Sequence, residues 1–155
     1  RTTCILFPTD FSQASFDGVR YAASLAARFG AELEFFHVMK IPAFIPRMPG
    51  EAPLVMPPSL IKKIDDKFED MVASVTDLLP EERISCEVTT GDDEAEVIAA
   101  TAVAKKADLI VIPRRGQGVL EGLVFGRVAE NLARISPVPT ILFDHEQVEL
   151  PETDE

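Results

Sequence analysis

Short apolar runs recur along the chain, separated by longer segments in which apolar residues return every three or four positions. Continuous apolar runs of four to eight residues are typical of strands that are buried on both faces of a parallel sheet. Such runs, together with a β-rich segment of alternating polarity at residues 83–89, predict five strands, at residues 4–7, 31–38, 83–89, 108–112 and 140–143.

The segments between these runs predict four helices, because their apolar residues fall on one helical face. Ser12 is a suitable N-cap for the first helix and Gly30 a suitable C-terminal stop. Ser59 is expected to cap the second helix, and Pro80 follows its end. The predicted helices cover residues 12–29, 59–79, 92–106 and 127–135.

Strict alternation of strands and helices predicts an α/β fold with a parallel sheet covered on both sides. Right-handed crossovers make this a single doubly wound, Rossmann-like domain with five strands and four helices, in the strand order 3-2-1-4-5. No internal repeat is visible. We expect one domain over residues 1–145 and an acidic tail over residues 146–155.

The segment from Met39 to Pro58 interrupts this regular alternation. It contains six of the chain's 12 prolines, and no helix or strand tolerates that density. Long loops within compact domains often carry function. The segment is therefore either a lid over a binding site, a surface that faces a second copy, or a disordered loop.

Composition narrows the possible partners. The net charge is −11, with 15 Lys and Arg against 26 Asp and Glu, which disfavours nucleic acid and anionic membrane surfaces. No apolar stretch reaches the ~20 residues that span a bilayer, and no signal peptide is visible at the start. The two cysteines, Cys4 and Cys86, lie in strand-like runs and are expected to be small buried hydrophobes. We expect a cytoplasmic protein.

Ligands of doubly wound sheets bind at the carboxyl ends of the strands, where the winding direction reverses. The first and fourth strands should be neighbours at that point. Pro8, Thr9 and Asp10 follow the first strand, and a segment that begins at Pro113 follows the fourth. Asp10 could accept hydrogen bonds from a ribose or a base. Alternatively, Asp10 and Ser12 only cap the first helix.

A glycine-rich loop follows the fourth strand and leads into a helix. Glycines and the free N–H groups of a helix N-terminus are features of anion sites. Three arginines concentrate positive charge in this otherwise acidic chain, which indicates an anionic ligand. Alternatively, the glycines only form turns, and the arginines are solvated or pair with Glu121 and Glu130. The loop residues concerned are Gly116, Gly118, Gly122, Gly126, Arg114, Arg115 and Arg127.

The sequence gives little support for a catalytic triad or a metal site. His37 would lie near Asp10 and Ser12, but the chain has no GxSxG nucleophile motif, so a structural histidine is favoured over a hydrolase triad. His145 lies in the tail. No His, Cys or carboxylate group has metal-ligand spacing. We therefore expect neither catalytic residues nor a resident metal.

Several motifs resemble the universal stress protein family. They are Pro8-Thr9-Asp10-Phe11-Ser12 after the first strand, His37-Val38 at the end of the second, and Gly126-Arg-Val-Ala-Glu-Asn131 followed by Ser136-Pro-Val-Pro-Thr-Ile-Leu142. The resemblance extends from Cys4 to about Phe143. It implies an adenine nucleotide alpha hydrolase-like fold and a homodimer through the fifth strand, Thr140 to Phe143, whose apolar edge a monomer would expose.

The ATP-binding branch of this family carries G-x-x-G, nine residues, and then Gly followed by Ser or Thr. Here Gly116 and Gly126 match, whereas Pro113 replaces the first glycine and Arg127 replaces the hydroxyl residue. Proline has no N–H to donate. Arg127 could instead meet a phosphate as a cation.

The resemblance thus implies a stress-response or signalling module that is not catalytic and whose nucleotide site is degenerate. The alternative is a switch that binds ATP or AMP, with Mg²⁺ held only by the nucleotide, and that hydrolyses ATP slowly at most. A flavoprotein on the same fold is a third hypothesis, which the absence of a longer flavin-binding region disfavours. The implied contacts are Pro8, Thr9, Asp10 and Val38 for the nucleoside, and Gly116, Gly126, Arg127 and Val128 for the phosphates.

Overall fold

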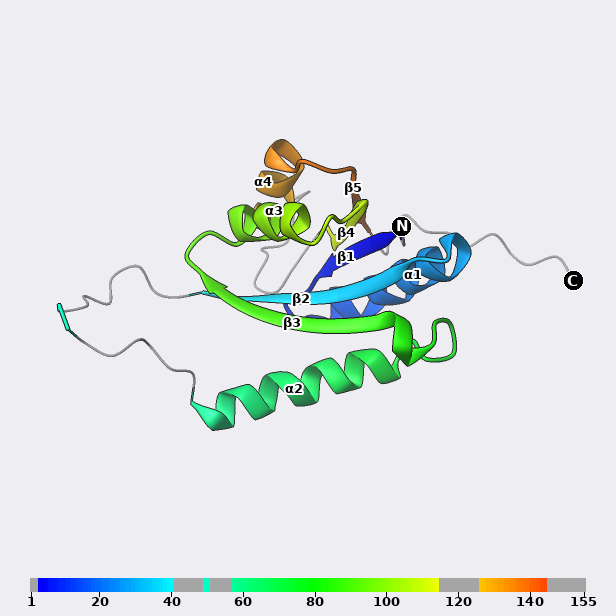
Figure 1. Cartoon of the computed structure of the whole chain (residues 1–155), viewed down its shortest axis with the longest axis horizontal. Coiled ribbons are helices and arrows are strands. Elements are labelled where there is room, and N and C mark those ends of the chain that lie inside the picture. Colours follow the sequence, from blue (N-terminus) through cyan, green and yellow to red (C-terminus); the bar gives the residue numbers. More distant parts are fainter. Residues whose placement is uncertain (1–2, 41–48, 51–56, 115–125, 145–155) are drawn as a thin grey trace, which may run out of the picture.

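The computed structural model of the 155-residue chain describes residues 3–40, 49–50, 57–114 and 126–144. Five strands alternate with helices (Figure 1). The elements are β1 (Cys4–Pro8), α1 (Gln13–Phe29), β2 (Glu32–Lys40), α2 (Pro58–Ala73), a short 3-10 helix (Glu81–Arg83), β3 (Ile84–Gly91), α3 (Glu94–Ala104), β4 (Leu109–Pro113), α4 (Arg127–Ile135) and β5 (Thr140–Phe143).

The five strands form one parallel sheet in the order β3-β2-β1-β4-β5, which confirms the predicted order. The pairing between β1 and β4 covers two residue pairs, Ile5 with Leu109 and Leu6 with Ile110. Neighbouring ladders are longer: β1 pairs with β2 over five residues and β4 with β5 over four. The winding direction reverses between β1 and β4, so this is the point where ligands of such sheets bind.

Two apolar layers cover the sheet, with α1 and α2 on one face and α3 and α4 on the other (Figure 1). Alternate strand residues serve alternate faces: Ile5 and Phe7 pack under α1 and α2, whereas Leu6 packs under α3 and α4. Because both faces of β1 are buried, its run is continuously apolar, as predicted. None of the helices in the described ranges is long and apolar enough to cross a membrane.

Helix α1 has the predicted boundaries. Ser12 is its N-cap, with Oγ accepting a hydrogen bond from Ser15 N at 3.3 Å. At the other end Gly30 adopts φ 61°, and Ala31 N donates to Ala26 O at 2.8 Å. Glycine meets this left-handed conformation without a Cβ penalty, which is why the helix ends there.

Helix α2 differs from the prediction at both ends. It begins after Pro57 rather than Ser59, without a side-chain cap, and it ends at Ala73 rather than near Leu79. The hydroxyl groups of Ser74 and Thr76 donate to Met71 O and Ala73 O, at 2.6 and 3.2 Å. Such local side-chain bonds compete with helical hydrogen bonds, so the helix gives way to turns.

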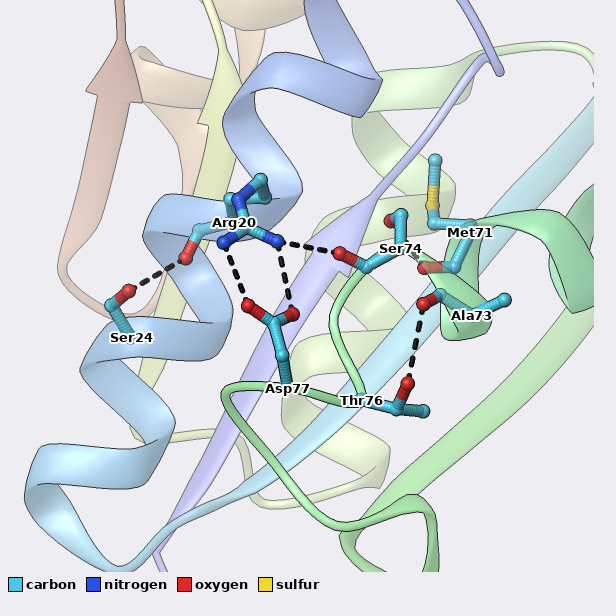
Figure 2. A network of polar contacts seen from close by, with 7 residues as sticks. All are labelled: Arg20, Ser24, Met71, Ala73, Ser74, Thr76 and Asp77. Carbon is cyan, nitrogen blue, oxygen red and sulfur yellow. Dashed lines mark hydrogen bonds and ion pairs between the residues drawn. The ribbon is translucent and has the colours of Figure 1, made fainter.

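A polar network joins this end of α2 to α1 (Figure 2). The Arg20 guanidinium reaches across from α1 and holds both carboxylate oxygens of Asp77, at 3.1 and 3.0 Å. Arg20 also donates to Ser74 O at 2.7 Å. The hydrogen bond from Arg20 lowers the pKa of Asp77 below its usual value. The pair fixes the geometry of the turn but is exposed, so its net contribution to stability is small.

On the other face, a buried carboxylate interrupts the apolar run of β2. Glu34 is 8% exposed and pairs with Lys105 Nζ at 2.7 Å. Lys105 also contacts Glu87 of β3, and this hydrogen bond lowers the pKa of Glu87. Buried carboxylates require such a partner. Lys105 therefore ties the end of α3 to β2 and β3.

The two cysteines are less buried than predicted. Cys4 is half-buried, and Cys86 is exposed, so the prediction for Cys86 was wrong. Cys86 lies on β3, which is an edge strand. Its thiol is nevertheless a poor nucleophile, because local desolvation and then the Glu34 and Asp65 carboxylates raise its pKa to about 11.

Candidate functional site

The turn after β1, residues 9–12, is held by side-chain oxygens. Thr9 is buried, and its Oγ1 accepts a hydrogen bond from Phe11 N at 3.0 Å. Asp10 Oδ1 accepts from Ser12 N and from Ser15 Oγ, both at 2.9 Å. Thr9 N donates to Phe36 O, which anchors the turn to β2. We call residues 9–12 the β1 turn.

Phe11 and His37 form an aromatic contact behind this turn. Their ring centroids lie 4.7 Å apart, and the Phe68 ring of α2 meets Phe11 edge-on at 5.0 Å. His37 Nδ1 lies 2.8 Å from Thr9 O. A carbonyl only accepts, so Nδ1 carries the proton. This arrangement is typical of a structural histidine, as the sequence favoured.

The end of β2 lies beside the β1 turn, since Pro8 pairs with Phe36. Val38 is half-buried and packs in the apolar layer under α3 and α4. At the last residue of β2, Lys40 Nζ lies 3.8 Å from Glu94 Oε1 at the start of α3. Val38 therefore offers an apolar surface at this edge of the sheet, flanked by charged groups.

The backbone where β4 ends is already committed to other partners. Pro113 has no N–H group. Arg114 N donates to Phe143 O at 2.7 Å, and Gly126 N donates to Arg114 O. We call Pro113, Arg114 and Gly126 together the β4 exit. Pro113 therefore has no N–H to offer a phosphate, and the N–H groups of Arg114 and Gly126 are bonded to other carbonyls.

The side chains of the β4 exit also have structural partners. Arg114 Nη1 pairs with Asp144 Oδ2 at 2.9 Å, and both side chains are largely buried, at 14% and 11% exposed. The Pro113 ring lies against α1: a Cβ added at Gly18 would come within 3.5 Å of Pro113 Cγ and 3.2 Å of Phe143 Cδ1. Neither predicted partner of the arginines, Glu121 or Glu130, is the partner of Arg114 in this ion pair.

Helix α4 begins at the β4 exit. Gly126 is its N-cap, has extended backbone and provides no side-chain cap. Glu130 N donates to Gly126 O, which is the first hydrogen bond of the helix. The N–H groups of residues 127–129 therefore have no partner within the helix. Arg127 is exposed at this end, and Val128 is half-buried against the apolar layer.

The predicted site residues thus occupy two neighbouring parts of one sheet edge. Pro8, Thr9 and Asp10 lie at the end of β1, with Val38 on β2 beside them, and Gly126, Arg127 and Val128 lie where β4 passes into α4. Gly116, Gly118, Gly122, Arg115, the tail and residues 41–48 and 51–56 of the Pro-rich segment lie outside the described residues. The ends of that segment are regular, contrary to the prediction, because Met39 and Lys40 belong to β2 and Pro58 begins α2. Within the described ranges, no group of three or more His, Cys, Asp or Glu side chains is placed to hold a metal ion.

Three residues of this region, Asp144, Phe68 and Phe11, had no role in the site predicted from the sequence. Asp144 is the first acidic residue after β5, and pairing of Pro113 with Phe143 brings it next to Arg114. The predicted order of β4 and β5 could have indicated this pair. Phe68 is simply part of an apolar helical stripe, and the left-handed backbone of Phe11, with φ 60°, has no signal in the sequence.

Comparisons with known proteins agree with this architecture. The family model described as the Universal stress protein family matches residues 3–144. The chain is 28% identical over 140 residues to Universal stress protein MJ0531 of Methanocaldococcus jannaschii, covering 89% of this chain and 79% of that protein.

Two solved structures are similar in fold and were determined with nucleotides. A universal stress protein in complex with cAMP superposes with a TM-score of 0.62 at 20% identity, covering 92% of this chain and 96% of the other. The universal stress protein from Archaeoglobus fulgidus in complex with dAMP gives a TM-score of 0.59 at 17% identity, with coverages of 93% and 98%. At these identities the likeness concerns the fold.

Proposed function

Because this chain belongs to the universal stress protein family, we propose that it is a non-catalytic stress-response module whose degenerate site takes an AMP-type nucleotide in preference to ATP. Proteins of the same fold bind cAMP and dAMP, which supports a nucleoside monophosphate as the ligand class. The observation that carries the preference is the β4 exit, where backbone donors that a longer phosphate chain would need are already used.

The nucleoside would lie at the β1 turn. Asp10 carries a half-buried carboxylate, and carboxylates accept hydrogen bonds from ribose hydroxyls or an exocyclic amino group. Val38 offers an apolar surface for the base on the neighbouring strand. Pro8 and Thr9 fix the position of Asp10, because Thr9 is anchored to Phe36 O and to His37.

The phosphate would lie at the start of α4. The N–H groups of residues 127–129 and the positive end of the helix dipole favour one anionic group there. Arg127 can add a charge-assisted hydrogen bond from its exposed guanidinium. Arg114 does not extend this site toward further phosphates, because its guanidinium is largely buried against Asp144.

The same features argue against efficient hydrolysis. Phosphoryl transfer requires cations, usually with Mg²⁺, that neutralise charge on the β- and γ-phosphates and orient the attacking water. Arg114, which follows β4, has its guanidinium engaged by the Asp144 carboxylate. Mg²⁺ would arrive only with a triphosphate, held by its oxygens. The proposal is therefore a binding function, with conformation or partners as the output.

Calorimetric titration of the full chain with AMP, ATP with Mg²⁺, and adenosine tests this proposal. We expect AMP to bind at least tenfold more tightly than adenosine and ATP to bind no more tightly than AMP. Arg127→Glu should weaken AMP by about tenfold or more, which is ~1.4 kcal/mol. Arg134→Glu, at the far end of the same helix, should leave the affinity unchanged.

A second outcome defines the alternative function. The exposed guanidinium of Arg127 at a helix N-terminus could also meet a triphosphate bidentately. If ATP bound more than tenfold tighter than AMP, and Arg127→Glu abolished this difference, the chain would be an ATP switch. Absence of binding by every nucleotide at millimolar concentration would leave the module without a nucleotide ligand.

We also propose that the chain forms a homodimer through β5. Among the described residues β5 pairs with β4 on one side, and its other edge has no strand beside it. Proteins generally cover such apolar edges, and an isologous pair of edges does so economically. Sedimentation velocity should show a species of twice the 17.0 kDa chain mass at micromolar concentration. A single 17.0 kDa species at that concentration would contradict the dimer.

A further inference from the structure

Phe11 has a left-handed backbone, with φ 60°. A bulky residue in this region is a genuine outlier, and it persists only where its surroundings hold it there. Left-handed residues in turns are usually Gly, Asn or Asp, so the conformation of Phe11 requires a local cause.

Two hydrogen bonds hold the backbone on either side of Phe11. Its own N–H donates to Thr9 Oγ1 at 3.0 Å, and the next N–H, that of Ser12, donates to Asp10 Oδ1 at 2.9 Å. Ser15 Oγ donates to the same Asp10 oxygen. The strained residue is therefore fixed by the side chains of Thr9 and Asp10.

The left-handed backbone places the Phe11 ring between two other elements. The ring lies 4.7 Å from that of His37 on β2 and 5.0 Å from that of Phe68 on α2, and Lys67 Nζ lies 5.6 Å from its centroid. Phe68 is buried and belongs to the face of α2 that packs on the sheet. Phe11 thus links the β1 turn directly to α2.

We propose that Phe11 is a conformational relay that reports ligand binding at the β1 turn to helix α2. The relay rests on the proposed nucleotide site, because Asp10, the carboxylate offered to the nucleoside, also holds the backbone that follows Phe11. A hydroxyl or amino group that donates to Asp10 Oδ1 competes with the N–H group of Ser12 and the hydroxyl of Ser15. When the hydrogen bond from Ser12 is lost, Phe11 relaxes to an extended backbone and its ring leaves Phe68.

Hydrogen–deuterium exchange of the full chain tests the relay. After calorimetry has established saturation, AMP should raise the exchange rate of amides in α2, residues 61–71, by at least threefold. Exchange in α3, residues 95–102, should not rise, because α3 packs on the opposite face of the sheet, where the base would lie against Val38. Unchanged exchange in α2 of a protein that binds AMP would overturn the relay and leave the proposed function intact.

Variants of Phe11 separate the effect of its left-handed backbone from the effect of its aromatic ring. Phe11→Gly tolerates φ 60° but has no ring, so α2 should exchange rapidly with or without AMP. Phe11→Leu keeps the strain and loses the aromatic contact, and we expect at least half of the AMP response to disappear. Phe29→Leu, which changes an exposed ring at the far end of α1, is the matched control and should respond as the wild type does. A full AMP response in Phe11→Gly would contradict the relay.

One arm of the test needs no ligand. Thr9→Val keeps the shape of the side chain and removes the oxygen that accepts from Phe11 N. The relay predicts faster exchange in α2 of this variant, by at least threefold, with α3 unchanged. If calorimetry detected no AMP binding, the proposed function would fail, and exchange in α2 of Thr9→Val equal to that of the wild type would independently overturn the relay.

Discussion

The β1 turn and the β4 exit lie at the same edge of the sheet, each after a buried central strand, and they use their polar groups differently. In the β1 turn, the hydrogen bonds rest on side-chain oxygens of Thr9 and Asp10, and the Asp10 carboxylate is the group proposed to meet the nucleoside. At the β4 exit, the N–H of Arg114 is bonded to Phe143 O of β5, and the N–H of Gly126 is bonded to Arg114 O. The Arg114 guanidinium is paired with Asp144.

This difference shows why a glycine pattern alone does not make a phosphate site. A cradle needs N–H groups that are oriented and have no other acceptor. Gly126 keeps the expected position at the start of α4, yet its N–H donates to Arg114 O. The comparison therefore supports the proposal that the nucleoside binds at the β1 turn, and it gives the β4 exit a mainly structural role.

The largest expected effect concerns the ion pair of the β4 exit. Asp144→Ala deprives the largely buried Arg114 guanidinium of this carboxylate, and breaking a buried pair from one side typically costs about 3 kcal/mol. We expect the free energy of unfolding, measured by urea denaturation, to fall by about this amount.

The control for this variant is the exposed pair of Figure 2. Asp77→Ala removes a carboxylate with equally good geometry but 62% exposure, and should lower stability far less. An equal loss in the two variants would mean that burial does not distinguish the pairs, and the structural role of the β4 exit would have to be abandoned.

The next effect concerns the β1 turn. Asp10→Ala removes the acceptor of Ser12 N and of the buried Ser15 Oγ, and leaving buried donors unsatisfied costs about 2 kcal/mol. The variant should also lose affinity for AMP by tenfold or more. Ser12→Ala, which removes the helix cap and the 3.4 Å contact of Ser12 Oγ with Ser15 Oγ, should cost about 1 kcal/mol and bind AMP normally. Normal AMP binding by Asp10→Ala would place the nucleoside elsewhere.

A smaller effect tests the packing behind the β4 exit. Gly18→Ala would place a Cβ 3.2 Å from Phe143 Cδ1, closer than ordinary contact. Overpacking of a core typically lowers the free energy of unfolding by about 1–3 kcal/mol. Alanine has a higher helix propensity than glycine, which offsets about 1 kcal/mol of this loss. We expect a net loss of about 1 kcal/mol in thermal or urea denaturation. A gain in stability would show that β5 can move away from α1 at little cost.

Strands β1 and β4 could be predicted to within about one residue because strands that are buried on both faces of a sheet carry continuous apolar runs. Strand β3 is an exposed edge strand and was predicted from its alternating, β-rich residues. Contacts between distant segments were not predictable in this way. From the sequence alone, Glu34 would be expected to face solvent, whereas in the structure it is buried and pairs with Lys105. Cys86 reads as buried until β3 is recognised as an edge strand.

In the candidate site, too, local contacts could be predicted and contacts between distant segments could not. Asp10 and Ser12 could be found from the sequence because their hydrogen bonds are local. The pairing of Arg114 with Asp144 depends on which strands are neighbours, and the left-handed Phe11 depends on a balance of contacts from β2 and α2. The end of α2 was missed because hydroxyl groups of Ser74 and Thr76, rather than a proline or glycine, compete with the helix.

The smallest expected effect comes from restoring the family's ATP motif. The double variant Pro113→Gly, Arg127→Ser returns the glycine and the hydroxyl group, and a motif-based view predicts a large gain in ATP affinity. We expect a change of no more than about threefold, or ~0.7 kcal/mol, because Arg114 N and Gly126 N remain bonded to Phe143 O and Arg114 O. Calorimetry with ATP and Mg²⁺ measures the change. A gain of a hundredfold would mean that these backbone bonds open readily, and that the β4 exit differs from a phosphate cradle only in its two substituted side chains.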